Sequence, residues 1–262
     1  MAYEVVQGHK GETRPDGAAL LLWGAWMAFL VGGVVFLLAP ELDLVVAGWF
    51  FSSHNSFVGN TPVVATVREF FKLMYIGACV LAILGVVFTH VRQRSWLGLA
   101  GVRWFLLLSC LIVGPGVVSN LALKDQWGRA RPREVVQFGG EKSFSGPLVP
   151  SRQCARNCSF VSGEASSIFM IFFAAALLFR RRAYPLVITG VTAGSLAGLI
   201  RISQGGHFLS DVVFAGIAMA ITAAVLSRLL ETIAPNWTDG WDPEGEPAFE
   251  NSAWSVWHVW PK

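Results

Sequence analysis

Six long runs of apolar residues constrain the fold of this 262-residue chain more than any other feature. A helix crosses the bilayer core with roughly 20 apolar residues, because lipid offers no partners for free backbone groups. Charged residues make up only 14% of the chain, against about 25% in soluble domains. We therefore predict an all-α integral membrane protein, a bundle of six transmembrane helices. The predicted spans are residues 17–39, 73–90, 104–123, 160–179, 183–200 and 208–227.

These runs also divide the chain into three parts. Residues 1–16 are expected to form a cytoplasmic N-terminal segment, and residues 233–262 an acidic tail rich in tryptophan. Between them, residues 17–232 form the predicted membrane domain, with a long outer loop at 133–159. The amphipathic segment 40–72 is expected to lie along the outer surface of the bilayer. The small net charge of +3 indicates no nucleic-acid partner.

Short basic loops set the expected orientation, because Lys and Arg in such loops favour the cytoplasmic side. One loop carries Arg92, Arg94 and Arg103, and another consists of residues 180–182. Six spans then place both termini in the cytoplasm. The outer loop and its flanks oppose this topology with seven positive charges, at Lys124, Arg129, Arg131, Arg133, Lys142, Arg152 and Arg156. Either the topology is inverted, or these charges serve an anionic substrate.

Three clusters of residues interrupt the apolar pattern, and the six-span count places all of them on one side of the membrane. They lie at the end of the third span, at the start of the fourth, and between the fifth and sixth. Their members are Lys124, Arg131, Pro132, Ser162, Gly163, Glu164, Arg201, His207 and Asp211. We therefore expect one composite site.

The first two clusters contain the residue types that bind phosphate. Lys124 and Arg131, together with Arg201 from the third cluster, would form a cationic cradle for phosphate oxygens. Ser162 and Gly163 stand at a predicted helix N-terminus, where free backbone N–H groups bind anions. The sequence therefore predicts a site for a phosphorylated substrate.

His207 and Asp211 are four residues apart, so they share one face of a helix. The carboxylate can hold one imidazole nitrogen protonated and direct the other at phosphorus. Taken alone, the pair is more typical of two buried ionisable groups that only stabilise each other. Next to a cationic cradle, it predicts a histidine nucleophile.

Together the clusters resemble the type 2 phosphatidic acid phosphatase superfamily of membrane lipid phosphatases. Its motifs are K-x6-RP, PSGH and SR-x5-H-x3-D. The first motif is complete here, and the third has its Arg, His and Asp at the family spacing, with Ile200 in place of Ser. The resemblance extends over about residues 20–230 and includes the helix count.

The resemblance implies a phosphohydrolase that needs no metal and no cofactor. It implies that His207 attacks phosphorus and becomes a phosphohistidine, that Asp211 orients it, and that water then hydrolyses the intermediate. The implied phosphate-binding residues are Lys124, Arg131, Ser162, Gly163 and Arg201.

The second motif departs from the family pattern, because Glu164 replaces the histidine that is assigned as proton donor to the leaving oxygen. A free glutamate has a pKa of about 4.3, and neighbouring cations lower it further. Three interpretations follow. Glu164 is a retuned acid with an acidic pH optimum, it steers an amine or hydroxyl of the substrate, or the chain is catalytically weak.

The outer loop carries two cysteines, Cys154 and Cys158, just before Ser162. A zinc site would need further Cys or His ligands nearby, so we expect a disulfide that braces this loop. Arg129 and Arg133 are expected to be solvated or to contact lipid headgroups.

The outer-loop sequences Phe138-Gly139-Gly140 and Asn157 to Gly163 are similar to bacterial lipid A phosphatases within the superfamily. This similarity implies a lipid phosphatase of a bacterial inner membrane, with its site facing the periplasm and lipid A as substrate. Undecaprenyl pyrophosphate and phosphatidylglycerol phosphate are the next candidates. A phospholipid-binding or transport protein without hydrolysis, and a lipid phosphotransferase, are the alternatives of another class.

Overall fold

The computed structural model describes residues 16–234, and within that range every regular element is a helix. The all-α prediction is confirmed. The expected cytoplasmic segment 1–16, apart from Asp16, and almost all of the tryptophan-rich tail lie outside the described residues. The α-helices are α1 (Gly17–Leu38), α2 (Leu42–Gly48), α3 (Pro62–Arg92), α4 (Gly101–Leu111), α5 (Gly163–Leu178), α6 (Ala183–Ser203) and α7 (Leu209–Ile233). A π-helix, η1 (Ile112–Lys124), continues α4, and short 3-10 turns are η2 (Pro132–Glu134), η3 (Val136–Phe138) and η4 (Arg180–Arg182).

Each of the six predicted spans overlaps a helix. Within the described residues, five helical segments are long and apolar enough to cross a membrane. They are Gly17–Leu38, Pro62–Arg92, Gly101–Lys124, Arg180–Ser203 and Leu209–Ile233. The sixth, α5, has only 16 residues. The count of six spans therefore stays a prediction.

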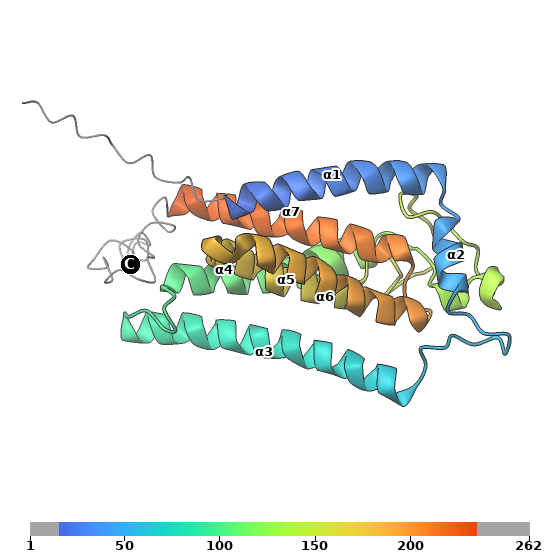
Figure 1. Ribbon diagram of the computed structural model, residues 1–262, viewed down its shortest axis with the longest axis horizontal. Coiled ribbons are helices and arrows are strands. Elements are labelled where there is room, and N and C mark those ends of the chain that lie inside the picture. Colours follow the sequence, from blue (N-terminus) through green and yellow to red (C-terminus); the bar gives the residue numbers. More distant parts are fainter. Residues whose placement is uncertain (1–15, 235–262) are drawn as a thin grey trace, which may run out of the picture.

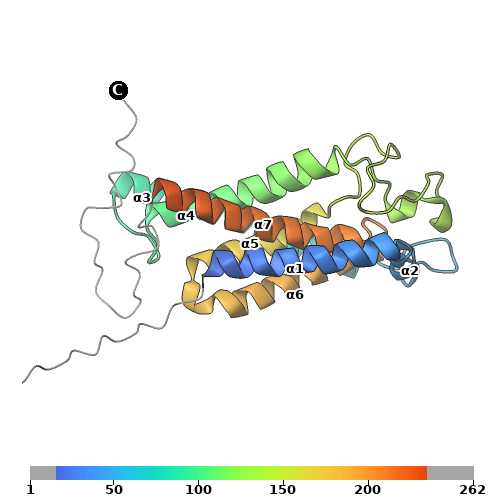
Figure 2. The ribbon, with the colours of Figure 1, turned by 90° about the horizontal axis from the view of Figure 1, so that it is seen from above.

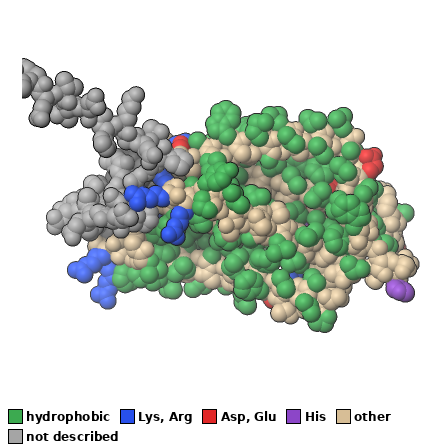
Figure 3. Space-filling view, in the orientation of Figure 1, with side chains coloured by type: hydrophobic (Ala, Val, Ile, Leu, Met, Phe, Trp, Pro, Cys, Tyr) green, Lys and Arg blue, Asp and Glu red, His purple; other side chains and the backbone are tan. Residues whose placement is uncertain are grey.

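The long helices run side by side along the long axis of the molecule (Figures 1 and 2). The two most central helices are α5 and α7: α5 packs on α6 and α7, and α7 also packs on α1. By contrast, α3 buries only Ala82, Gly85 and Thr89 and exposes large apolar side chains. Figure 3 shows apolar side chains over the flank and Lys and Arg side chains gathered at one end. This surface suits contact with lipid.

The segment 40–72 is not a surface strip throughout, so this prediction is wrong in part. Helix α3 begins at Pro62, because the Thr61 hydroxyl accepts a hydrogen bond from the Val64 N–H at 3.3 Å and proline suits the first helical turn. The predicted span began at residue 73 because charged residues precede it. Helix α2, which was not predicted, packs on α7 and buries Asp43.

Glycines allow several helices to approach closely, as in other membrane bundles. On α3, a Cβ atom at Gly85 would lie 2.1 Å from the Trp104 ring of α4. A Cβ atom at Gly77 of the same helix would meet nothing within 4 Å. Gly85 therefore sets the distance between α3 and α4, and Gly77 does not.

We predict that Gly85→Ala destabilises the bundle by about 1–3 kcal/mol, because the Trp104 ring must move to make room. The matched variant Gly77→Ala should keep or slightly raise Tm, because alanine favours helices more than glycine does. Thermal unfolding in detergent measures both. Equal Tm values for the two variants would contradict the close packing of α3 on α4.

Candidate active site

The three polar clusters meet at the end of the bundle that carries α2 and the outer loops (Figure 1). Lys124 ends η1, Ser162 precedes α5, Arg201 lies in the last turn of α6, and His207 precedes α7. Direct contacts connect these three clusters. The Ser162 N–H donates to the carbonyl oxygen of Asp211 at 3.1 Å, and a Cβ atom at Gly163 would lie 3.0 Å from Lys124 Nζ.

Two atoms of the predicted cradle are buried without a hydrogen-bond partner. Among the described residues, three buried side-chain atoms lack one, and two of these are Ser162 Oγ and Arg201 Nε. An unpaired buried polar group costs roughly 1–3 kcal/mol, so such groups are rare unless a ligand satisfies them. The third atom is Ser145 Oγ, outside the cradle. A phosphate oxygen is an acceptor that both cradle atoms can serve.

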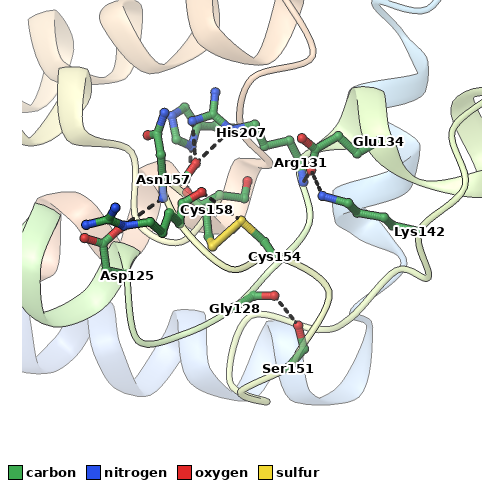
Figure 4. The surroundings of a disulfide bond; sticks show 12 residues. Asp125, Gly128, Arg131, Glu134, Lys142, Ser151, Cys154, Asn157, Cys158 and His207 are labelled. Carbon is green, nitrogen blue, oxygen red and sulfur yellow. Dashed lines mark hydrogen bonds and ion pairs between the residues drawn. A yellow bond between two sulfur atoms is a disulfide. The ribbon is translucent and has the colours of Figure 1, made fainter.

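Arg131 is held by the loop that Cys154 and Cys158 close as a disulfide. Its Nε and Nη2 donate to the carbonyl oxygen of Asn157, inside that loop, at 3.2 and 2.7 Å. The Asn157 N–H donates in turn to Asp125 Oδ1 at 3.0 Å. Figure 4 shows the disulfide, Asn157 and Arg131 beside His207. Within the described residues no group of His, Cys, Asp and Glu side chains could hold a metal ion.

The imidazole of His207 is buried and fixed through one nitrogen. Its Nδ1 lies 2.7 Å from the carbonyl oxygen of Ser159. A carbonyl oxygen can only accept, so Nδ1 carries the proton and the lone pair belongs to Nε2. Burial, reinforced by the charges of Lys124 and Arg201 and opposed by Asp211, lowers the pKa of His207 to about 4. At neutral pH the ring is therefore neutral.

Asp211 lies within ion-pair distance of the imidazole but makes no direct hydrogen bond to it. Its Oδ2 lies 3.7 Å from His207 Nδ1, too far for a hydrogen bond. The carboxylate instead accepts from Ser159 Oγ at 2.5 Å and from the Phe208 N–H at 2.8 Å. Asp211 therefore links Ser159, at the end of the outer loop, to the start of α7 just after His207.

Glu164 forms ion pairs with two arginines. Arg68 of α3 donates to its carboxylate through Nε at 2.9 Å and Nη2 at 2.7 Å, and Arg201 Nε lies 3.5 Å away. Arg68 was not among the predicted site residues, because it falls in the segment 40–72 that was expected to lie along the outer surface. A charged residue close to an apolar run was the available signal.

Arg129 is not solvated, so this prediction is wrong. Its side chain is 1% exposed and forms ion pairs with Asp211 at 2.6 Å and with Asp43 at 2.7 Å. An acidic residue inside the apolar segment of α2 was the signal that a cation had to be buried with it. Arg133, by contrast, is exposed, as predicted.

Comparison with known proteins agrees with this geometry. Residues 103–234 match the PAP2 superfamily. The chain is 39% identical over 206 residues to a lipid A 4'-phosphatase of Francisella tularensis subsp. novicida, covering 75% of this chain and 90% of that protein. It is 30% identical over 240 residues to a lipid A 4'-phosphatase of Rhizobium etli, covering 82% and 88%.

A lipid A 1-phosphatase of Rhizobium etli is 33% identical over 153 residues, covering 56% of this chain and 57% of that protein. No solved structure matches the chain. A match over half of the chain, together with relatives that align over most of their length, shows the family. The chain is therefore a lipid phosphatase that belongs to the PAP2 superfamily, in its bacterial lipid A phosphatase branch.

Proposed function

We propose that the protein removes a phosphate group from lipid A, at the periplasmic face of the inner membrane, through a phosphohistidine on His207. One observation carries the proposal: a buried neutral imidazole with a fixed tautomer shares its site with Ser162 Oγ, which has no partner, and Arg201 Nε, which forms no hydrogen bond and lies 3.5 Å from the carboxylate of Glu164. The relatives that align over most of their length are named as 4'-phosphatases, which favours the 4'-phosphate.

In the first step, His207 Nε2 attacks phosphorus, the bond to the lipid oxygen breaks, and that oxygen keeps the bonding electron pair and takes a proton from water. Negative charge on the phosphoryl oxygens is stabilised by Lys124, Arg131 and Arg201, and by the Ser162 hydroxyl and the N–H groups at the start of α5. In the second step, water attacks the phosphohistidine, releases inorganic phosphate and restores the neutral ring. Asp211 serves both steps by holding Ser159, whose carbonyl oxygen accepts a hydrogen bond from Nδ1 of His207.

Glu164 remains ionised in this proposal. Two contacts from Arg68 and one ion pair from Arg201 surround its carboxylate, and each favours the charged form. A paired carboxylate of this kind is a poor proton donor. We infer that Glu164 positions the guanidinium groups of Arg68 and Arg201 at the phosphate and does not protonate the leaving oxygen.

The basic outer loop is compatible with a periplasmic site, because many of its charges are engaged within the protein. Arg129 pairs with buried carboxylates, Arg131 binds a backbone carbonyl, and Lys142 pairs with Glu134 at 3.0 Å. The short loops between α3 and α4 and at η4, at the opposite end of the bundle, then set the orientation. Both termini are cytoplasmic in this arrangement.

We predict that His207→Ala lowers phosphate release by at least about a thousandfold, because the covalent step has no other nucleophile. Incubation with lipid A labelled at the 4'-phosphate should leave label on the wild-type protein and on His54→Ala, whose histidine is exposed, but not on His207→Ala. Undecaprenyl pyrophosphate and phosphatidylglycerol phosphate are tested in parallel, and faster release from either would overturn lipid A as substrate. Release that requires an acceptor lipid would indicate a phosphotransferase, and no release from any lipid would indicate a binding protein.

The low pKa of His207 predicts the acid limb of the pH profile. Protonation of Nε2 removes the attacking lone pair, so activity is lost only as pH falls through the pKa of the folded protein, about 4. The acid limb of kcat/KM should therefore lie well below the value near 6.5 of a free histidine. A limb centred near pH 6.5 would contradict a buried neutral ring.

Glu164→Gln tests the proton donor. If Glu164 only positions Arg68 and Arg201, the variant lowers kcat but keeps the alkaline limb of the kcat profile at the wild-type pH. Arg68→Gln should lower kcat similarly, because it breaks the same ion pair. Loss of the alkaline limb in Glu164→Gln alone would show that Glu164 is the acid.

A further inference from the structure

A buried cluster of charges joins Asp211 to two residues that are not defined positions of the family motifs, Arg129 and Asp43. The Arg129 guanidinium donates through Nη2 to Asp43 Oδ2 at 2.7 Å and through Nη1 to Asp211 Oδ1 at 2.6 Å. Nη1 also contacts Ser210 Oγ at 2.8 Å, and Nε donates to the carbonyl oxygen of Ser145 at 2.9 Å. Every nitrogen of the guanidinium thus has a partner.

Burial makes this arrangement sensitive to the loss of any member. The side chains of Asp43 and Asp211 are fully buried and that of Arg129 is 1% exposed. One cation lies between two carboxylates, so its removal would leave two like charges without water to screen them. The guanidinium also lies over the ring of Phe208, which follows His207 in the chain, with its central carbon 4.4 Å from the ring centroid.

The cluster reaches the nucleophile by two routes. Asp211 accepts a hydrogen bond from Ser159 Oγ. The carbonyl oxygen of Ser159 accepts a hydrogen bond from His207 Nδ1, 2.7 Å away. The backbone carbonyl of Arg129 also accepts from the Ser159 N–H at 2.9 Å. Arg129 therefore holds Ser159 through its own backbone and, through Asp211, by its side chain.

Asp43 connects helix α2 to Arg129 and to the start of α7. It lies on α2, between α1 and α3, and its Oδ1 accepts from the Ser210 N–H at 2.8 Å in the first turn of α7. Helix α2 packs on α7. The carboxylate thus fixes Arg129 and the start of α7 together.

Resting on the function proposed above, we propose that Arg129 and Asp43 are positioning residues for the nucleophile. They act through Asp211 and Ser159 to keep His207 Nδ1–H donating to the Ser159 carbonyl oxygen, so that Nε2 faces the phosphate. They are not assigned a contact with the substrate. Their loss should therefore slow the attack without weakening phosphate binding.

The test is single-turnover formation of phosphohistidine from labelled lipid A, with KM measured in the steady state. Arg129→Gln should slow the attack by at least about a hundredfold, as expected when a buried charge loses its partner, with KM within about threefold. Asp43→Asn should slow it by about tenfold, because Arg129 keeps Asp211. The controls Glu41→Gln and Arg152→Gln, both exposed, should match the wild type.

The double variant Asp43→Asn/Arg129→Gln separates positioning from general damage. Removal of Arg129 leaves Asp43 as an uncompensated buried charge, so Asp43→Asn should restore part of the attack rate that Arg129→Gln loses. A double variant that is slower by the product of the two single effects would overturn the proposal. So would a folded Arg129→Gln with wild-type kcat, or one whose loss lies entirely in KM.

Thermal unfolding shows whether Arg129→Gln folds. If it does not, the attack rates of Asp43→Asn and Glu41→Gln are compared, and equal rates overturn the proposal. Failure of the proposed function looks different. In that case the wild-type protein itself carries no label and His207→Ala keeps its activity. A labelled wild type with unaffected Asp43 and Arg129 variants rejects only the positioning role.

Discussion

The ion pairs of Arg129 with Asp43 and Asp211 are the interaction on which the rest of the site depends. They lie where four separate parts of the chain meet: helix α2, the segment after η1, the end of the outer loop and the start of α7. Breaking one side of a buried ion pair costs roughly 3–5 kcal/mol, whereas keeping it intact adds little net stability. The two ion pairs therefore matter more for the position of the nucleophile His207 than for the free energy of unfolding.

The bilayer explains why so many cations can share one end of the protein. Helices satisfy their own backbone, so polar side chains are free to gather where helices end. Lys124, Arg131 and Arg201 repel one another there, and a phosphate group would relieve that repulsion. Arg129 is different, because two carboxylates already compensate it. The positive charges at this end of the protein are thus of two kinds: those that can bind an anion, and Arg129, which holds the fold.

The sequence was sufficient for those features that depend on local patterns. Apolar runs located every long helix, and motif spacing identified the residues that the structure brings together around His207. Prediction from the sequence failed for ion pairs whose two residues lie far apart in the chain. Helix α3 was begun too late because Arg68 was taken as a surface residue, although its partner Glu164 lies on α5. Arg129 and Asp43 were missed for the same reason, since 86 residues separate them. No local spacing identifies such a pair.

Glu164 shows how a change in one motif can alter one half of a reaction and leave the other intact. The attack depends on His207, Ser159 and the cradle, none of which needs a histidine at position 164. The carboxylate recruits Arg68 from α3, a helix that otherwise buries few side chains. This brings another guanidinium to the site in place of a titratable ring. In the proposed reaction, Arg68 and Arg201 stabilise the charge of the departing oxygen, which then takes its proton from water and not from residue 164.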